Sequence, residues 1–247
     1  MEEIKTQVKA EYKSRYIILI IVLVGVMMAV IDGIVVSIAL PTITSYFNVD
    51  VSLSQWTITA YLLTMTGLLL VFGKLSERYG KVKLFIVGFS IFTLSSLACG
   101  FSTSLPMLIA FRVAQGFGAA MSTSISGAIL FQAFPMSERG KAMGFLGSAI
   151  AVGSIAGPVL GGIIVDTLGW KYIFLINVPI GIVLIALSFK YLAVKEPAPK
   201  KLDMDWIGSA LLVTFMVSLM LFLGTLGDLS SITPVELGLA ALFIISL

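Results

Sequence analysis

The feature that most constrains this chain is a series of apolar runs, each about as long as a bilayer is thick. A membrane-spanning helix needs about 20 mostly apolar residues, and seven runs approach or exceed that length. We place them at 16–40, 54–72, 82–101, 108–134, 141–165, 170–192 and 206–225. An eighth run begins at Val235 and has 13 residues at Leu247, too few for a crossing helix. The chain is therefore expected to be an all-α, polytopic membrane protein with an incomplete last helix.

The composition agrees with a protein whose solvent is the lipid bilayer. Hydrophobic residues make up 58% of the chain and charged residues 12%, whereas soluble domains have about 25% charged residues. The sequence has no histidine and one cysteine, Cys99, inside an apolar run. These absences exclude a disulfide within the chain, a histidine base and a cysteine–histidine metal cluster. We therefore expect no enzyme, no metal site and no cofactor, and a packing role for Cys99.

The lysines and arginines predict which side of the membrane each connection faces. All but two of the 16 lie before the first run or in the second, fourth and sixth connections. The exceptions are Lys171, in the fifth connection, and Arg112, inside a run. Cytoplasmic connections carry an excess of basic residues, so we expect a multi-pass protein of the cytoplasmic (inner) cell membrane with a cytoplasmic N-terminus. Because these cations follow the membrane edge, the sequence does not indicate nucleic-acid binding.

The runs divide the chain into four parts. We expect residues 1–15 to form a cytosolic lead-in and residues 16–192 to form a six-helix bundle. Residues 193–203 contain prolines and lysines and are interpreted as a cytoplasmic linker. Residues 204–247 are expected to add a helix pair, the second of which is incomplete.

An internal repeat relates the junction of the second and third spans to that of the fifth and sixth. Similar residues recur 89 positions apart, so that Gly73, Glu77, Gly80 and Phe85 correspond to Gly162, Asp166, Gly169 and Phe174. Three spans separate the two copies, so the second copy must be inverted in the membrane. The six-helix bundle is therefore expected to be a three-plus-three inverted repeat.

A short charged turn is expected between the second and third spans, at 73–83. Gly73 and Gly80 bracket it and allow close helix contact and a positive φ. Glu77 lies in its middle, where the carboxylate can meet Arg78 or the N-terminus of a helix. The turn places four cations and this one carboxylate at the boundary between lipid and water.

Two ionisable residues lie inside predicted spans. At a rise of 1.5 Å per residue, Asp32 is about 14 Å from the outer end of the first span, and Arg112 is about 10 Å below the same face. These similar depths allow the two side chains to face one another across the bundle. A charge in mid-membrane is costly and usually marks a substrate pathway or a proton relay, so we expect both residues to take part in proton coupling. The alternative is a fixed structural ion pair.

Other polar residues follow inward faces of the predicted helices. In the fourth span the residues at helical spacing are Arg112, Gln115, Ala119, Ser122 and Ser126. Tyr61 lies on a similar polar stripe in the second span, and Asn177 lies on one face of the sixth. We expect Tyr61, Gln115 and Asn177 to line a substrate cavity. Asn177 has the alternative of bonding a neighbouring backbone group.

Glycines are spaced by four in the fifth span. Gly153, Gly157 and Gly161 form a ridge of small residues along one helix face, which lets another helix approach closely. Pro158 removes one backbone hydrogen bond and permits a bend.

Five segments of the chain resemble motifs of the Major Facilitator Superfamily: 31–41, 73–83, 112–119, 153–162 and 169–181. The first and last are similar to the 14-helix drug:proton antiporter branch, and 153–162 is similar to the signature that marks antiporters rather than symporters. The chain departs from the family pattern at Glu77, where aspartate is usual, and at Val82, where a base is common. It departs from the branch at Ile34 and Ser37, which replace threonine and asparagine.

The resemblance implies the N-terminal half of an antiporter that exports drugs or other lipophilic or cationic small molecules by alternating access. The proton gradient would supply the energy, and the missing C-terminal half would lie in the same or another chain. The implied cytoplasmic gate consists of Gly73, Glu77, Arg78, Gly80 and Lys81, and the implied antiporter signature includes Gly153, Gly157, Pro158, Gly161 and Gly162. Two alternatives remain: a proton-coupled metabolite symporter of the same fold, and a truncated membrane fragment that transports nothing.

Overall fold

The computed structural model describes residues 2–192, 206–225 and 238, and every regular element within them is a helix. The elements are α1 (Glu2–Phe47), α2 (Val51–Ser54), α3 (Trp56–Tyr79), α4 (Lys81–Gly100), α5 (Leu105–Ala133), α6 (Arg139–Thr167), α7 (Tyr172–Leu175), α8 (Asn177–Tyr191) and α9 (Trp206–Thr225). Six segments of the described chain are long and apolar enough to cross a membrane: Arg15–Phe47, Val51–Tyr79, Lys81–Gly100, Leu105–Ala133, Arg139–Thr167 and Tyr172–Tyr191. The expectation of an all-α, multi-pass membrane protein is confirmed.

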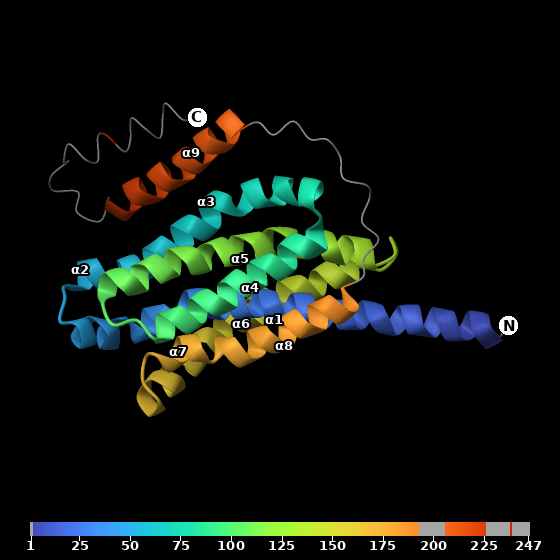
Figure 1. The fold of residues 1–247 in the computed structure, drawn as a ribbon, viewed down its shortest axis with the longest axis horizontal. Coiled ribbons are helices and arrows are strands. Elements are labelled where there is room, and N and C mark those ends of the chain that lie inside the picture. Colours follow the sequence, from blue (N-terminus) through green and yellow to red (C-terminus); the bar gives the residue numbers. More distant parts are fainter. Residues whose placement is uncertain (1, 193–205, 226–237, 239–247) are drawn as a thin grey trace.

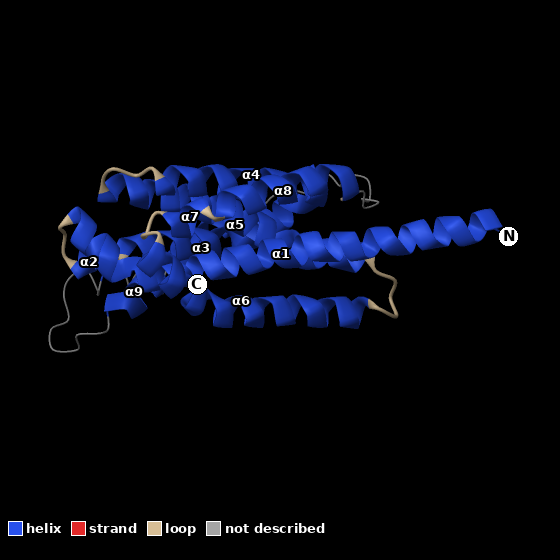
Figure 2. Cartoon of the chain, turned by 90° about the horizontal axis from the view of Figure 1, so that it is seen from below, coloured by secondary structure: helices blue, strands red, loops and turns tan. Residues whose placement is uncertain are grey.

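The six spans form one bundle, and the N-terminal turns of α1 project beyond it (Figures 1 and 2). Residues 2–15, which belong to the expected lead-in, continue the helix of the first span without a break. The predicted seventh run coincides with α9, which packs beside α3 on the outside of the bundle (Figure 1). The predicted linker at 193–203 and the run from Val235 lie outside the described residues, apart from position 238.

The interior of the bundle is filled by aromatic and branched side chains at one end and by a second cluster at the other. Phe85 and Phe92 of α4 are buried in the first cluster, together with Ile21 and Val22 of α1. The second cluster includes Phe174. The backbones of α4 and α5 approach closely where the two helices cross. At this point a Cβ atom added to Gly88 would lie only 2.7 Å from Cβ of Met121. Small residues at such crossings allow tight packing of membrane helices.

The predicted charged turn at 73–83 is wrong in its extent. Helix α3 continues through Gly73 to Tyr79, and α4 begins at Lys81, so Gly80 alone separates the two helices. Lysine, glutamate and arginine are good helix formers, and the charged residues therefore prolong the second span. Gly80 has the predicted positive φ of 94°. Gly73 is helical and has no neighbouring atom within 4 Å of an added Cβ, so it makes no close helix contact.

The predicted inverted repeat is visible in the backbone. Among the described glycines, those with positive φ are Gly80 at 94° and Gly169 at 95°, which the 89-residue spacing relates. Their repeat-related neighbours Phe85 and Phe174 are both fully buried. Each positive-φ glycine ends a long helix and reverses the chain, at opposite ends of the bundle.

Two proline positions change the predicted helix ends. The first span was expected to end at Leu40, but α1 continues through Pro41 to Phe47. Packing accounts for this extension, because Ile43 is fully buried and the Phe47 ring lies 5.6 Å from that of Trp170. The sixth span is divided at Ile176 into α7 and α8. Pro179 has no N–H to donate to the carbonyl of Leu175, which explains the interruption at this point.

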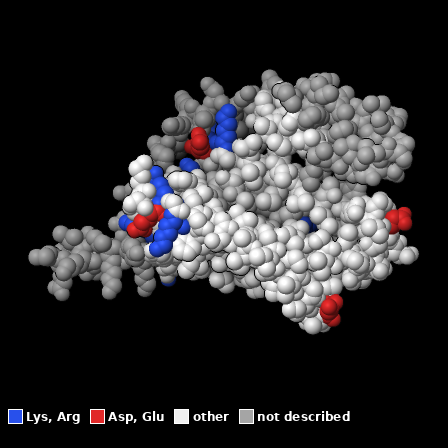
Figure 3. Space-filling view, turned by 180° about the vertical axis from the view of Figure 1, so that it is seen from behind, with Lys and Arg blue, Asp and Glu red and all other residues white. Residues whose placement is uncertain are grey.

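Charged side chains mark the two ends of the bundle. Figure 3 shows lysine and arginine side chains gathered near the end from which α1 projects. We call this the cation-rich end; the cations at the helix ends there are Lys74, Arg78, Lys81, Lys83, Arg139, Lys141 and Lys190. The connections at the opposite end contain Asp50 and Lys171.

Candidate functional site

Asp32 of α1 and Arg112 of α5 form an ion pair in the middle of the bundle. Nη1 of Arg112 donates to Oδ2 of Asp32 over 2.5 Å, and both side chains are fully buried. The two side chains therefore meet across the bundle, as their similar predicted depths allowed, and a role in proton coupling stays a prediction. The pair lies in an environment where an isolated charge is costly, so each residue provides the counter-charge that the other requires.

Two amide side chains bind the second oxygen of the carboxylate. Nε2 of Gln115 and Nδ2 of Asn177 each donate to Oδ1 of Asp32 over 2.9 Å. The same two nitrogens donate their other hydrogens to Oγ of Ser96, over 3.0 Å and 3.1 Å. Ser96 in turn donates to the carbonyl of Phe174 over 3.0 Å. We call Asp32, Ser96, Arg112, Gln115 and Asn177 the Asp32 cluster.

The carboxylate of Asp32 and the amide nitrogens of Gln115 and Asn177 have most of their hydrogen-bonding positions occupied. Each of the two amide nitrogens has two hydrogens, and both hydrogens have an acceptor. Oδ1 of Asp32 accepts two N–H groups, whereas Oδ2 accepts one. A free lone pair therefore remains on Oδ2, the oxygen that contacts Arg112.

Arg112 is also anchored to α3 and to its own helix. Its Nε donates to the carbonyl of Thr57 over 2.9 Å, and Nη1 also donates to Oε1 of Gln115 over 2.8 Å. The guanidinium carbon lies 4.0 Å from the centre of the Tyr61 ring, a cation–π contact. Nη2 of Arg112 is buried and has no hydrogen-bond partner among the described residues. Arg112 therefore keeps several contacts that do not depend on Asp32.

Three participants in this site were not predicted. Ser96 accepts from both amides, the backbone carbonyl of Thr57 accepts from Arg112, and the thiol of Cys99 lies 3.8 Å from Oε1 of Gln115. Ser96 and Cys99 are three residues apart and lie on one face of α4, but this spacing does not identify their partners on other helices. A backbone carbonyl leaves no sequence signal.

The predicted cavity residues lie in or beside the Asp32 cluster. Gln115 and Asn177 bind Asp32, and Tyr61 stacks on Arg112 while its hydroxyl donates to the carbonyl of Ala29 over 3.0 Å. Ser122 and Ser126 are buried on the predicted stripe, but their hydroxyls donate to carbonyls within α5. A substrate-binding role for Tyr61, Gln115 and Asn177 stays a prediction.

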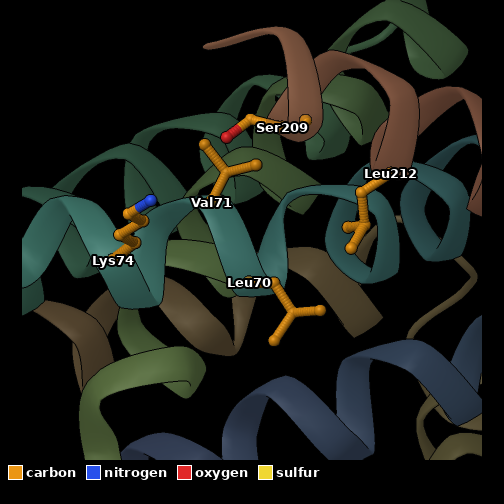
Figure 4. Close-up of a pocket in the computed structure, with 6 residues that line it drawn as sticks. Leu70, Val71, Lys74, Ser209 and Leu212 are labelled. Carbon is orange, nitrogen blue, oxygen red and sulfur yellow. The ribbon is translucent and has the colours of Figure 1, made fainter. Parts of the chain in front are cut away.

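Two recesses lie near the cation-rich end, and neither includes a member of the Asp32 cluster. One, of about 190 Å³, is lined by Leu70, Val71, Lys74, Gly208, Ser209 and Leu212, and lies between α3 and α9 (Figure 4). The other lies between α4 and α8. Among the described residues no group of three histidine, cysteine or carboxylate side chains is arranged to hold a metal ion.

The glycine ridge of α6 packs on the helix that carries Asp32. Gly153, Gly157 and Gly161 are buried against α1, where the nearest side chains are those of Met27, Val30, Ile34 and Val35. The predicted close helix contact is therefore confirmed, with α1 as the partner. Gly162 lies off this contact, with no atom within 4 Å of an added Cβ, and Pro158 is exposed within a continuous α6.

The proposed gate residues are placed at the cation-rich end. Glu77 and Arg78 are exposed in the last turn of α3, and the Arg78 guanidinium lies 5.5 Å from the centre of the Tyr79 ring. The described part of the chain gives neither residue an ion-pair partner. Lys81 begins α4. A gating role for these residues stays a prediction.

Comparison with known proteins extends over most of the chain. The family model of the Major Facilitator Superfamily matches residues 22–247. The riboflavin transporter RibZ of Clostridioides difficile is 38% identical over 213 residues, which are 86% of this chain and 46% of RibZ. The multidrug export protein EmrB of Escherichia coli is 35% identical over 192 residues, which are 78% of this chain and 38% of EmrB. The chain thus spans less than half the length of these relatives.

A solved structure shows the same fold. It is a bacterial homologue of the human lysosomal transporter Spinster in an inward-facing, occupied conformation, with a TM-score of 0.66 and 17% identity. The match covers 85% of this chain and 54% of that protein. RibZ and EmrB are both named for transport or export, which agrees with the expectation that the chain is not an enzyme. The helices, the inverted repeat and the matched residues together show that this chain belongs to the Major Facilitator Superfamily.

Proposed function

We propose that this chain supplies the proton-coupled half of an antiporter that exports lipophilic or cationic small molecules by alternating access. The observation that carries the proposal is the fully buried Asp32–Arg112 pair in the centre of the membrane bundle. Removing one partner of such a pair leaves an uncompensated buried charge and typically costs 3–5 kcal/mol. A proton on Asp32 has the same electrostatic consequence for Arg112 and is reversible.

The geometry of Asp32 supports a specific sequence of events. A proton can be added to Oδ2 without displacing Gln115 or Asn177 from Oδ1. It removes the charge that attracts Arg112, which remains held on the α3 side by the carbonyl of Thr57. Proton uptake therefore weakens one link between α1 and α5, and proton release restores it. Such a change biases the relative positions of helices, as alternating access requires.

The distribution of cations supports a cytoplasmic membrane location with the cation-rich end in the cytoplasm. Lysine and arginine collect on the cytoplasmic side of membrane proteins, and the end from which α1 projects has this character (Figure 3). In this orientation Glu77, Arg78 and Lys81 lie where a cytoplasmic gate would close against a second six-helix half. That half, in the same or another chain, is part of the proposal.

The test is Asp32→Asn in the protein expressed from its complete reading frame. In everted membrane vesicles energised with a proton gradient, we expect transport of ethidium, used as the lipophilic cation, to fall at least about tenfold, the loss that corresponds to 1.4 kcal/mol. The matched control is Asp166→Asn, because Asp166 is an exposed carboxylate at the end of the bundle opposite the cation-rich end. The control should transport ethidium at the original rate.

A second variant separates loss of coupling from loss of folding. Asp32→Asn leaves Arg112 buried without a counter-charge, whereas Asp32→Asn combined with Arg112→Gln removes both charges. The double variant should regain stability while transport remains uncoupled from the proton gradient. Unchanged ethidium transport in a folded Asp32→Asn protein would exclude Asp32 from the mechanism.

Transport of a flat aromatic metabolite is the second candidate. The 38% identity to a riboflavin transporter favours it. Riboflavin and ethidium can be compared in the same vesicles by following the pH change that each substrate causes when added to de-energised membranes. An antiporter moves protons opposite to its substrate and a symporter moves them with it, so the sign of the pH change identifies the class.

A further inference from the structure

A groove lies on the outside of the bundle between α4 and α8, at the cation-rich end. Its volume is about 630 Å³, within the range of about 300–1,000 Å³ that is usual for small-molecule sites. The lining residues are Val82, Lys83, Ile86, Val87, Ser188, Phe189 and Leu192. None of them belongs to the Asp32 cluster or to the proposed gate, so the groove is separate from the proposed transport mechanism.

Five of the seven lining residues are apolar, and two of these, Val87 and Phe189, face outward. Phe189 is 73% exposed and Val87 is 40% exposed, and both lie within segments that are long and apolar enough to span a membrane. Exposed apolar side chains in such segments face acyl chains rather than water. The natural neighbour of this surface is therefore a lipid, and the hollow gives one acyl chain a defined place against the protein.

The positive charge at the mouth of the groove favours a lipid with an anionic headgroup. Lys83 is exposed in the first turn of α4, and none of the seven lining residues is acidic. Lys81 and Lys190 lie beside the lining residues in sequence and add to the positive charge. Lys83 has no ion-pair partner in the part of the chain that the structure describes. An exposed lysine at the membrane boundary extends its ammonium group to the headgroup level.

We propose that this groove binds one anionic phospholipid. An acyl chain lies along Ile86, Val87 and Phe189, and the lipid phosphate binds the ammonium group of Lys83. Basic pockets between membrane helices on the cytoplasmic side are suited to anionic headgroups, and the cation-rich end is expected to face that side. The proposal does not depend on which solute the protein transports or on proton coupling.

Photo-crosslinking in nanodiscs tests the proposal. Phosphatidylglycerol and phosphatidylcholine, each with a diazirine in an acyl chain, are compared at equal mole fraction, and labelled peptides are identified by mass spectrometry. The expected result is an excess of phosphatidylglycerol label on residues 82–87 and 188–192. A single lysine near an anionic headgroup gives a preference of about fivefold, and Lys83→Ala should remove this preference. The matched control is Lys141→Ala, a cation at the same end that does not line the groove.

A second variant tests the apolar part of the site without changing its charge. Val87→Trp fills the groove with a large side chain and should displace the label from both segments while the protein elutes as a folded monodisperse species. Equal labelling by the two lipids, or a preference that Lys83→Ala leaves unchanged, would show that the groove holds only non-selective surrounding lipid. Absence of label from both lipids would show that protein covers the groove. Either result overturns the proposal.

Discussion

The Asp32 cluster brings together side chains from four helices through very few atoms. Two amide nitrogens, one from α5 and one from α8, each bond the same carboxylate oxygen and the same serine hydroxyl. Ser96 is therefore the acceptor on which both amides depend for their second hydrogen. In a buried site, a donor without an acceptor costs about 1–3 kcal/mol. The small side chain of Ser96 is therefore expected to contribute to stability by serving as the acceptor for both amides.

Replacement of Ser96 tests this dependence. We expect Ser96→Ala to lower stability by about 1–3 kcal/mol, because one N–H each of Gln115 and Asn177 loses its acceptor. Ser90→Ala is the matched control, since Ser90 lies on the same helix and its hydroxyl donates to the carbonyl of Ile86 within α4; its loss should cost less than about 0.5 kcal/mol. Unfolding in detergent can be followed with a thiol-reactive dye, because Cys99 is fully buried in the folded protein.

The coupling between Ser96 and Asn177 can be measured with a double-mutant cycle. The combined Ser96→Ala and Asn177→Ala variant should lose less stability than the sum of the two single variants, with a coupling of about 0.5–3 kcal/mol. Additive losses would contradict the hydrogen-bond arrangement described for the Asp32 cluster.

The charged residues of this site can be predicted from the sequence, whereas the role of Ser96 cannot. Charges are rare inside apolar runs, so Asp32 and Arg112 are visible without a structure, and helix rise places them at similar depths. Serines are common in membrane helices and usually bond their own backbone, as Ser90 does. The role of Ser96 arises only because α4 and α8 meet beside Asp32, and this contact cannot be derived from residue spacing.

At the level of helices, the glycine ridge of α6 determines how closely that helix approaches α1. Gly161 faces Val35, one turn along α1 from Asp32, and the ridge continues through Gly157 and Gly153. The helix that provides the buried carboxylate is thus held from one side by α6 and from the other by the Asp32 cluster. The ridge contributes to the site without containing a polar group.

Adjacent glycines of α6 provide a direct test. A Cβ on Gly161 would lie 2.6 Å from Cγ2 of Val35, whereas a Cβ on Gly162 would have no neighbour within 4 Å. We expect Gly161→Ala to cost about 1–3 kcal/mol through overpacking, and Gly162→Ala to be neutral or to stabilise by up to about 1 kcal/mol through its better helix propensity. The thermal unfolding midpoints of the two variants measure the difference. Equal effects would mean that the ridge does not fix the distance between α6 and α1.

Helix existence was easier to predict than helix ends. Apolar length was sufficient for the six spans and for α9, but the second span was prolonged to Tyr79 by residues that are charged and favour helix. The first span continued through Pro41 because tertiary contacts of Ile43 and Phe47 compensate for the lost backbone hydrogen bond. Gly80 and Gly169, by contrast, mark helix ends at both copies of the repeat, since their backbone conformation is unfavourable for other residues.

For the whole molecule, the inverted repeat determines the arrangement of the spans, and the charge distribution indicates their orientation in the membrane. The repeat relates two three-helix units and fixes how the spans are arranged, as the paired conformations of Gly80 and Gly169 show. The repeat does not indicate which end faces the cytoplasm, because inversion exchanges the two ends. The orientation therefore depends on the cations alone, and it requires an independent measurement.

Accessibility of single introduced cysteines provides that measurement. Thr103 is exposed between α4 and α5 at the end opposite the cations, and Ser137 is exposed between α5 and α6 at the cation-rich end. With a membrane-impermeant maleimide, Thr103→Cys should react in intact cells and Ser137→Cys only after the membrane is opened. The native Cys99 can remain in both variants, because it is fully buried and the unmodified protein provides its own unlabelled control. The reverse pattern would invert the orientation that the positive-inside bias predicts, and reaction of both cysteines in sealed cells would contradict an odd number of crossings between them.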